Sequence, residues 1–167
     1  MRLKTIISLV FCTGLGLVGV PHAAQAHGDK FNFGTPAEVT QATRIIKITM
    51  LDLAFQPNLI QVKQGEIVRF VVTNTSQVDH DFTLGDAVTQ SAHRKEMAEM
   101  AAMGDMAEMH DHMSHDPNAI FVKAGATKEI TWKFPRAMTI EFACNVPGHY
   151  EAGMKGVIKI SALGATQ

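Results

Sequence analysis

The stretch Cys144-Asn145-Val146-Pro147-Gly148-His149-Tyr150-Glu151-Ala152-Gly153-Met154 decides how this chain is interpreted. It places a thiol, an imidazole and a thioether at intervals of five residues, between two runs of strand-forming residues. Pro147, Gly148 and Gly153 favour turns, so the segment is expected to be a loop that reverses direction. The sequence therefore predicts three soft donors gathered on one loop between two β-strands.

Short alternating apolar runs flank this loop, as in an all-β chain. Ile130, Trp132 and Phe134 alternate with polar residues, a pattern typical of a strand with one buried face. Turn residues separate the runs, as in a sandwich. The expected strands cover residues 45–51, 59–62, 67–73, 80–84, 119–122, 129–134, 139–143 and 156–160. The pattern predicts an all-β fold, a Greek-key β-sandwich or barrel.

Residues 1–26 have the features of a secretory signal peptide. A basic start precedes an apolar run over residues 5–20 and the small-residue ending Ala24-Gln25-Ala26, so the mature chain is expected to begin at His27 in the periplasm. The alternative is a membrane anchor, but the run is shorter than the roughly 20 residues that span a bilayer. Removal leaves Cys144 as the single cysteine in an oxidising compartment, where a thiol needs burial or a bound ligand.

The charge balance excludes several classes of protein. The chain has 167 residues, of which 15 are basic and 16 acidic, giving a net charge of −1. Nucleic-acid binders need a basic surplus to neutralise phosphates, and membrane-surface proteins need polybasic segments. Two cysteines are also too few for a disulfide-rich scaffold.

The donor set of the loop is typical of a copper site. Sulfur ligands combined with imidazole select copper, and two histidines with one cysteine and a weak axial methionine form the blue-copper arrangement. The second histidine must come from elsewhere in the chain. His80 opens a strand-like run, and it is the remaining histidine outside the Met/His-rich segment and the new amino terminus. Position and elimination therefore both favour His80.

With this motif, the chain resembles the cupredoxins, the small copper proteins related to plastocyanin, azurin and rusticyanin. The resemblance covers about residues 44–161, and the Cys-x4-His-x4-Met spacing is most similar to the rusticyanin-like branch. It implies a Greek-key sandwich with one type 1 copper at one end. It also implies four copper ligands, with three strong ones and an axial thioether: His80, Cys144, His149 and Met154.

One residue departs from the family pattern. Many cupredoxins carry asparagine after the first histidine ligand, where it ties the two ligand loops together, and this chain has Asp81. A carboxylate near a copper thiolate favours the oxidised ion and can titrate. The alternative is that Asp81 points into solvent, as most aspartates do. The resemblance also implies that His149 reaches the surface within an apolar patch of Val146, Pro147 and Tyr150.

Residues 86–118 interrupt the strand pattern with a segment rich in methionine and histidine, expected to be partly helical or disordered. Methionines at every third position from Met97 to Met109 sweep about 240° around a helix, so one face cannot bury them all. Gly104 and Asp105 also weaken a continuous helix. The alternatives are a helix that packs its methionines on the core and a low-complexity loop.

We expect this segment to bind metal, because thioethers suit copper(I) and imidazoles also suit copper(II). The candidate secondary ligands are Met97, Met100, Met103, Met106, Met109, His110, His112, Met113 and His115. His27 is a further candidate, since its α-amine and imidazole can chelate copper(II) together. An incidental terminal residue is the alternative for His27.

Three functions are compatible with these features. A cupredoxin with an inserted Met/His segment behind a signal peptide resembles the CopI-type copper-tolerance proteins, which implies periplasmic copper resistance. A plain electron carrier explains the copper centre equally well but not the segment. An enzyme is disfavoured because multicopper enzymes use His-x-His pairs across several domains, although slow oxidation of segment-bound copper(I) by the copper centre is compatible with the site.

The expected organisation has five parts. A signal peptide (1–26) is followed by an N-terminal extension (27–43), a cupredoxin domain (44–161) with its Met/His-rich insertion (86–118), and a C-terminal tail (162–167). The expected partners are copper ions and a periplasmic redox or copper-transfer protein. No nucleic acid and no membrane insertion of the mature chain are expected.

Overall fold

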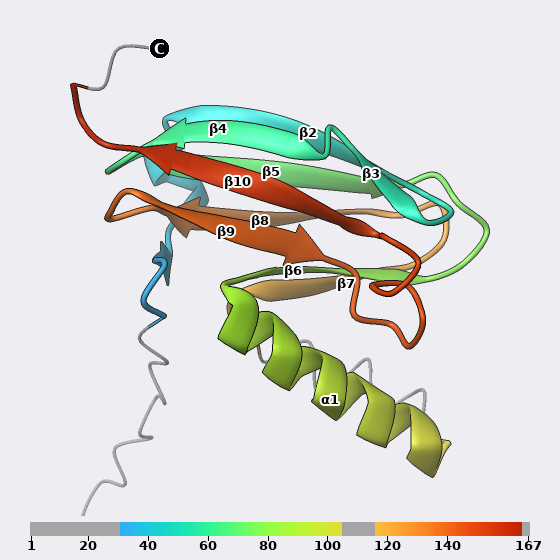
Figure 1. Ribbon diagram of the computed structural model, residues 1–167. Helices are drawn as coiled ribbons and strands as arrows, with labels where there is room; N and C mark the ends of the chain where they lie inside the picture. The colour runs from blue at the N-terminus through green and yellow to red at the C-terminus, as the bar shows by residue number, and fades with distance from the viewer. Residues whose placement is uncertain (1–30, 105–115, 165–167) are drawn as a thin grey trace, which may run out of the picture.

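Two five-stranded sheets form a sandwich in the computed structural model, which describes residues 31–104 and 116–164 (Figure 1). The first sheet contains, in spatial order, β1 (Thr35–Pro36), β8 (Thr127–Lys133), β5 (Ile67–Asn74), β2 (Arg44–Leu51) and β3 (Ala54–Gln56). The second contains β4 (Leu59–Lys63), β10 (Lys155–Ser161), β9 (Met138–Ala143), β6 (His80–Gly85) and β7 (Ala119–Val122). The pairs β2–β5 and β4–β10 are parallel, and the other pairs are antiparallel. The predicted all-β sandwich is confirmed.

The core lies between the sheets and follows from the alternation of apolar residues. In β5, Val68, Phe70 and Val72 are fully buried, while their neighbours are only partly covered. The Phe82 ring of β6 lies 5.4 Å from the Phe142 ring of β9, centroid to centroid. Aromatic pairs of this kind contribute about 0.5–1.5 kcal/mol beyond their burial. They stiffen the two strands, β6 and β9, that lead to the candidate metal centre.

The amino-terminal residues add structure that the sequence did not predict. The short strand β1 pairs with β8, and a 3-10 helix, η1 (Val39–Gln41), follows it. Phe33 is buried and stacks on Trp132 with ring centroids 5.6 Å apart. Part of the segment expected to be an extension outside the domain therefore packs into the sandwich.

The insertion begins with a helix, α1 (Ala87–Met103), which lies along the outer side of the second sheet, next to β6 and β7 (Figure 1). The Asp86 side chain accepts a hydrogen bond from the Thr89 amide and caps the amino-terminal end. Gly104 ends the helix in the left-handed conformation, with φ 76°, which glycine adopts without a steric penalty. The sequence-based expectation of a helical part that fails near Gly104 is confirmed.

The methionines of α1 divide between two environments. Met97 and Met100 are buried and pack with Ala119 and Phe121 of β7, whereas Met103 is 68% exposed. The packing alternative therefore explains Met97 and Met100. Met103 is exposed, as expected from the spacing of the methionines, which turns it away from the helix face that buries Met97 and Met100.

Several predicted features lie outside the described residues. These are the signal peptide 1–26, the candidate ligand His27, and the secondary ligands Met106, Met109, His110, His112, Met113 and His115. In the described part of the chain, no helix is long and apolar enough to span a bilayer.

Candidate metal centre

The candidate centre forms where β6 begins and β9 ends. β6 starts at His80, and Cys144 follows directly after the last residue of β9. The antiparallel register pairs Thr83 with Ala143, and its continuation places Asp81 opposite Asn145. Two strands that are distant in sequence thus deliver an imidazole and a thiol to the same end of the second sheet.

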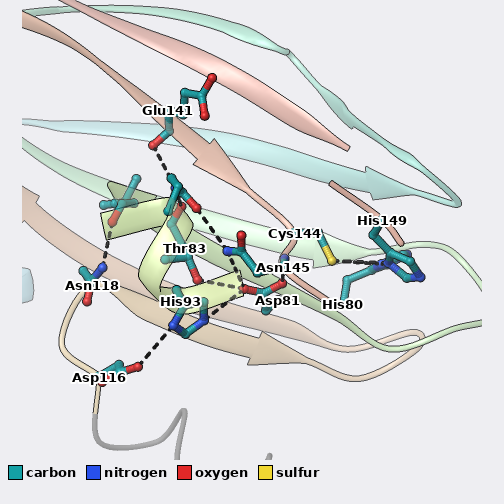
Figure 2. A network of polar contacts seen from close by, with 12 residues as sticks. His80, Asp81, Thr83, His93, Asp116, Asn118, Glu141, Cys144, Asn145 and His149 are labelled. Atoms are coloured by element: carbon teal, nitrogen blue, oxygen red, sulfur yellow. Dashed lines mark hydrogen bonds and ion pairs between the residues drawn. The ribbon is translucent and has the colours of Figure 1, made fainter. Parts of the chain in front are cut away.

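Three side chains point their donor atoms toward one another at this end (Figure 2). Cys144 Sγ lies 3.6 Å from His80 Nδ1 and 3.3 Å from His149 Nδ1. The two Nδ1 atoms are 3.1 Å apart. One thiol sulfur and two ring nitrogens therefore converge on one point, although their sequence positions span two strands and a loop.

The loop from Cys144 to Met154 is closed by its own backbone. The Cys144 amide donates to the Met154 carbonyl at 3.1 Å, and the Met154 amide donates to the His149 carbonyl at 2.9 Å. Gly148 and Gly153 have φ of 88° and 98°, which L side chains rarely adopt. Met154 is fully buried beneath this loop. The predicted turn residues thus hold the three donor positions of the sequence motif together.

Hydrogen bonding fixes which nitrogen of His80 faces the centre. Ser76 Oγ lies 2.8 Å from Asn74 Oδ1, 2.9 Å from the Val78 carbonyl and 2.9 Å from His80 Nε2. The first two are acceptors only, so the single hydroxyl proton is used there and Ser76 accepts from Nε2–H. Nδ1 of His80 is left with a lone pair, as a metal ligand requires.

The ionisable groups are suited to binding a cation. Burial, and then the neighbouring His149, lower the pKa of His80, and burial lowers the pKa of His149. Both imidazoles are therefore neutral near pH 7. Burial, and then the charge of Asp81, raise the pKa of the Cys144 thiol, so the metal-free thiol is protonated. Binding of a metal at this sulfur must release that proton.

Asp81 is fully buried and ties the two ligand segments together. Its carboxylate accepts a hydrogen bond from the Asn145 amide and another from Thr83 Oγ1 at 2.7 Å (Figure 2). Burial by itself raises the pKa of Asp81, but contacts with His93 and Thr83 outweigh burial and hold it below its usual range. The alternative that Asp81 points into solvent is wrong, because its side chain is fully buried on the face of β6 that helix α1 covers, against His93.

Helix α1 braces the same loop from outside the sheet. Gln90 Nε2 donates to the Thr83 carbonyl at 2.8 Å, and Gln90 Oε1 accepts from Asn145 Nδ2 at 3.0 Å. His93 Nε2 lies 3.5 Å from Asp81 Oδ2. Asp81 and Asn145 are therefore held by the insertion as well as by the sandwich. The roles of Gln90 and Asn145 could not be predicted from the sequence, because ordinary amides at scattered positions give no pattern.

The surface around His149 is more polar than the family resemblance implies. Val146 and Tyr150 are partly covered, and Pro147 is exposed. The Tyr150 hydroxyl donates to Glu141 at 2.9 Å, and its ring lies 3.8 Å from the Arg94 guanidinium carbon. Tyr150 thus belongs to a charged surface as much as to an apolar one.

The donors present fit copper. A cysteine sulfur and two imidazoles, with Cys144 and His80 buried and His149 partly exposed, match the trigonal donor set of blue-copper sites, and a buried methionine closes the same loop. His80, Cys144 and His149 are brought together as the sequence analysis expected. Met97 and Met100 lie in a separate apolar cluster under β7.

Comparison with known proteins agrees with this chemistry. The profile described as "Copper binding proteins, plastocyanin/azurin family" matches residues 42–161. The chain is 42% identical over 158 residues to the "Copper-resistant cuproprotein CopI" of Pseudomonas aeruginosa, covering 83% of this chain and 86% of that protein. It is 41% identical over 144 residues to the protein of the same name from Rubrivivax gelatinosus, covering 85% and 82% of the two chains.

A solved structure also matches the fold. Auracyanin B superposes with a TM-score of 0.59 over 77% of this chain and 96% of its own, at 23% identity. At that identity the match supports the sandwich architecture alone.

Proposed function

This chain belongs to the plastocyanin/azurin family of copper-binding proteins, and on that premise we propose that it protects the periplasm against copper. In this proposal one type 1 copper is held by His80, Cys144 and His149, with Met154 as the axial ligand. The identity of 41–42% to two copper-resistant cuproproteins supports the physiological role. The proposed signal peptide, residues 1–26, supports export.

The convergence of three donor atoms at the end of β6 and β9 carries the proposal. The sulfur of Cys144 and the Nδ1 atoms of His80 and His149 lie within 4.8 Å of one another. When bound there, copper supplies one-electron redox chemistry. The chain supplies the geometry. A hydrogen bond to Ser76 orients His80, and Asp81 holds the amide of Asn145, the residue after Cys144. A stiff sandwich limits rearrangement of the ligands between the two oxidation states.

Electron transfer to another periplasmic protein is a second candidate. His149 is the ligand that is partly exposed, and Pro147 and Gly148 beside it are exposed. An electron can therefore leave through this imidazole at the surface. The two roles differ in the number of copper ions expected per chain. An electron carrier needs one copper, whereas a protective protein removes more copper if it binds several ions.

We propose that any redox chemistry of the chain is single-electron exchange rather than substrate turnover. The described residues contain one cluster with the ligands of a type 1 centre. Oxidation of bound copper(I) by this centre transfers one electron and leaves copper(II) at the donor and copper(I) at the acceptor.

Deletion of residues 105–115, with a short glycine-serine linker in their place, tests the contribution of the Met/His segment. Wild-type protein is expected to bind more than one equivalent of copper(I), because thioethers suit that ion. The deletion is expected to lose the excess and keep the visible absorption of the type 1 centre. Titration of the mature protein with copper(I) under a competing chelator measures this.

Complementation of a deletion strain separates the two roles. Wild type is expected to restore copper tolerance, and Cys144→Ser and the 105–115 deletion are expected to restore it only in part. The electron carrier would be favoured if wild type and the 105–115 deletion each bound one copper per chain and if Cys144→Ser and the deletion both restored full copper tolerance. That result would contradict the protective role.

A further inference from the structure

A second cluster of metal-binding side chains lies on the outer side of the second sheet, away from the type 1 ligands. His93 and Glu96 are one turn apart on α1, and Asp116 precedes β7. One ligand atom from each of the three side chains lies within 4.8 Å of the others. The three residues come from the two ends of the insertion, so the fold and not the local sequence brings them together.

The imidazole of His93 is buried without a good hydrogen bond. Its side chain is 6% exposed, with Nδ1 3.5 Å from Asp116 Oδ2 and Nε2 3.5 Å from Asp81 Oδ2 (Figure 2). Both distances exceed the roughly 2.7–3.2 Å of a normal hydrogen bond. Among the described residues Nε2 has no partner at hydrogen-bond distance, and its nearest acceptor is the Asp81 carboxylate, on the side of the ring opposite Asp116. A buried polar side chain without a normal hydrogen bond calls for an explanation, and a bound ion is one of them.

The surroundings leave room for an ion at the Nδ1 side. His93, Glu96 and Asp116 line a surface pocket of about 320 Å³, together with Phe31 and Asn118. The three side chains offer one imidazole nitrogen and two carboxylates. Asp81 adds a further buried negative charge on the opposite side of the ring. A dication placed here would be attracted by the two acids and ligated by the imidazole.

We propose that His93, Glu96 and Asp116 form a second metal site for a divalent ion of the copper(II) or zinc(II) class. Imidazole combined with carboxylate suits these ions, which stand highest in the affinity order of the first-row divalent metals. Calcium and magnesium prefer all-oxygen ligands. The proposal goes beyond the type 1 centre, whose thiolate and axial thioether belong to a different ligand class.

The second site is connected to the type 1 centre by two contacts. His93 lies against Asp81, and Asp81 accepts the amide of Asn145, the residue after Cys144. An ion bound at Nδ1 draws electron density from the imidazole and strengthens its Nε2–H as a donor to Asp81. Occupancy of the second site therefore alters the hydrogen bonding around the copper thiolate.

Zinc binding to copper-loaded protein tests the site. The type 1 centre is first filled with copper(II), and zinc equivalents are then counted by equilibrium dialysis in wild type, in the double variant E96Q/D116N and in the matched control E99Q. Glu99 lies on the same helix, is exposed and pairs with Lys95 at 3.7 Å, so its substitution removes one carboxylate charge of α1 outside the cluster. Magnesium in place of zinc controls for non-specific attraction to acids.

The double variant is expected to bind one zinc equivalent fewer than wild type or E99Q, or to bind it at least about tenfold more weakly. Saturating zinc is expected to shift the visible band of the type 1 copper in wild type and E99Q only. Equal zinc binding in all three proteins would overturn the site, and an unshifted band at saturation would overturn its link to the copper. The presence of the visible band reports the type 1 centre. Its absence in copper-loaded wild type would therefore count against the proposed function, independently of zinc binding.

A second measurement covers the case in which the double variant does not fold. Crystals of wild-type protein soaked in zinc are expected to show an anomalous peak at the zinc edge between His93, Glu96 and Asp116. A peak elsewhere, with none at these side chains, would show that the cluster is a structural network that ties α1 to the sheet, and would overturn the proposal.

Discussion

Cys144→Ser is expected to abolish the intense visible absorption of the copper-loaded protein. That absorption arises from charge transfer between a thiolate and copper(II), and Cys144 is the one cysteine among the described residues. The substitution replaces sulfur with a smaller oxygen and keeps the shape of the side chain, so the fold should persist. Visible spectra of both proteins after loading with one equivalent of copper(II), with far-ultraviolet circular dichroism as a check of folding, measure the effect.

The Cys144→Ser protein should still bind some copper(II), because His80 and His149 keep their convergent nitrogens. Its spectrum is expected to be that of a weakly coloured nitrogen–oxygen site. Met138→Leu provides a matched control, since it removes a sulfur from β9 and leaves the loop intact. An unchanged band in Cys144→Ser, or its loss in Met138→Leu, would contradict the proposed ligand assignment.

Asp81→Ala is expected to destabilise the metal-free protein by about 3 kcal/mol. The change leaves the buried Asn145 amide and the Thr83 hydroxyl without their acceptor, and it removes the negative charge beside His93. Asp81→Asn is the matched control, because it retains one acceptor oxygen and should cost less. Urea unfolding curves give the difference in free energy of unfolding.

Asp81→Asn also tests whether the charge of Asp81 affects the copper, because it removes the charge and keeps one acceptor oxygen. Loss of the carboxylate charge disfavours copper(II), so the reduction potential of Asp81→Asn is expected to rise by tens of millivolts, where ~59 mV corresponds to a tenfold change in relative affinity for the two oxidation states. An unchanged potential in Asp81→Asn would contradict an electrostatic role for Asp81.

The contribution of Asp81 depends on pH in a definite direction. The pKa of Asp81 is lowered by folding, so its stabilisation is present above about pH 4 and is lost in stronger acid. The pKa of His93 is raised, so stabilisation by its cation is complete below about pH 6.5 and is lost as the pH rises through the raised value. The cost of Asp81→Asn should therefore be larger at about pH 5.5 than at about pH 9. A larger cost at the higher pH would contradict this pairing.

Much of the sandwich followed from residue patterns. The eight predicted strands correspond to β2, β4 to β10, with differences of at most two residues at their ends. Their alternation is long enough to define a buried face. β1 and β3 have two and three residues, too few to show any period, and their pairing is set by neighbours distant in sequence. Local patterns cannot identify such strands.

The candidate metal centre likewise combines residues that a local sequence pattern identifies with residues that only tertiary contacts identify. The spacing of Cys144, His149 and Met154 on one loop is a local signal, and His80 was identified because few histidines remained. The partners that hold these ligands follow from the register of β6 against β9, and from the place where α1 packs. Ser76 and Asn145 are common polar residues, and their roles depend on contacts that no spacing in the sequence records.

X-ray absorption at the copper edge of the loaded, full-length mature protein tests the central claim most directly. The account predicts one short copper–sulfur bond and two copper–nitrogen bonds to imidazole in wild type, with the sulfur lost in Cys144→Ser. A first coordination shell of nitrogen and oxygen alone in wild type would contradict it, because copper would then be bound away from Cys144.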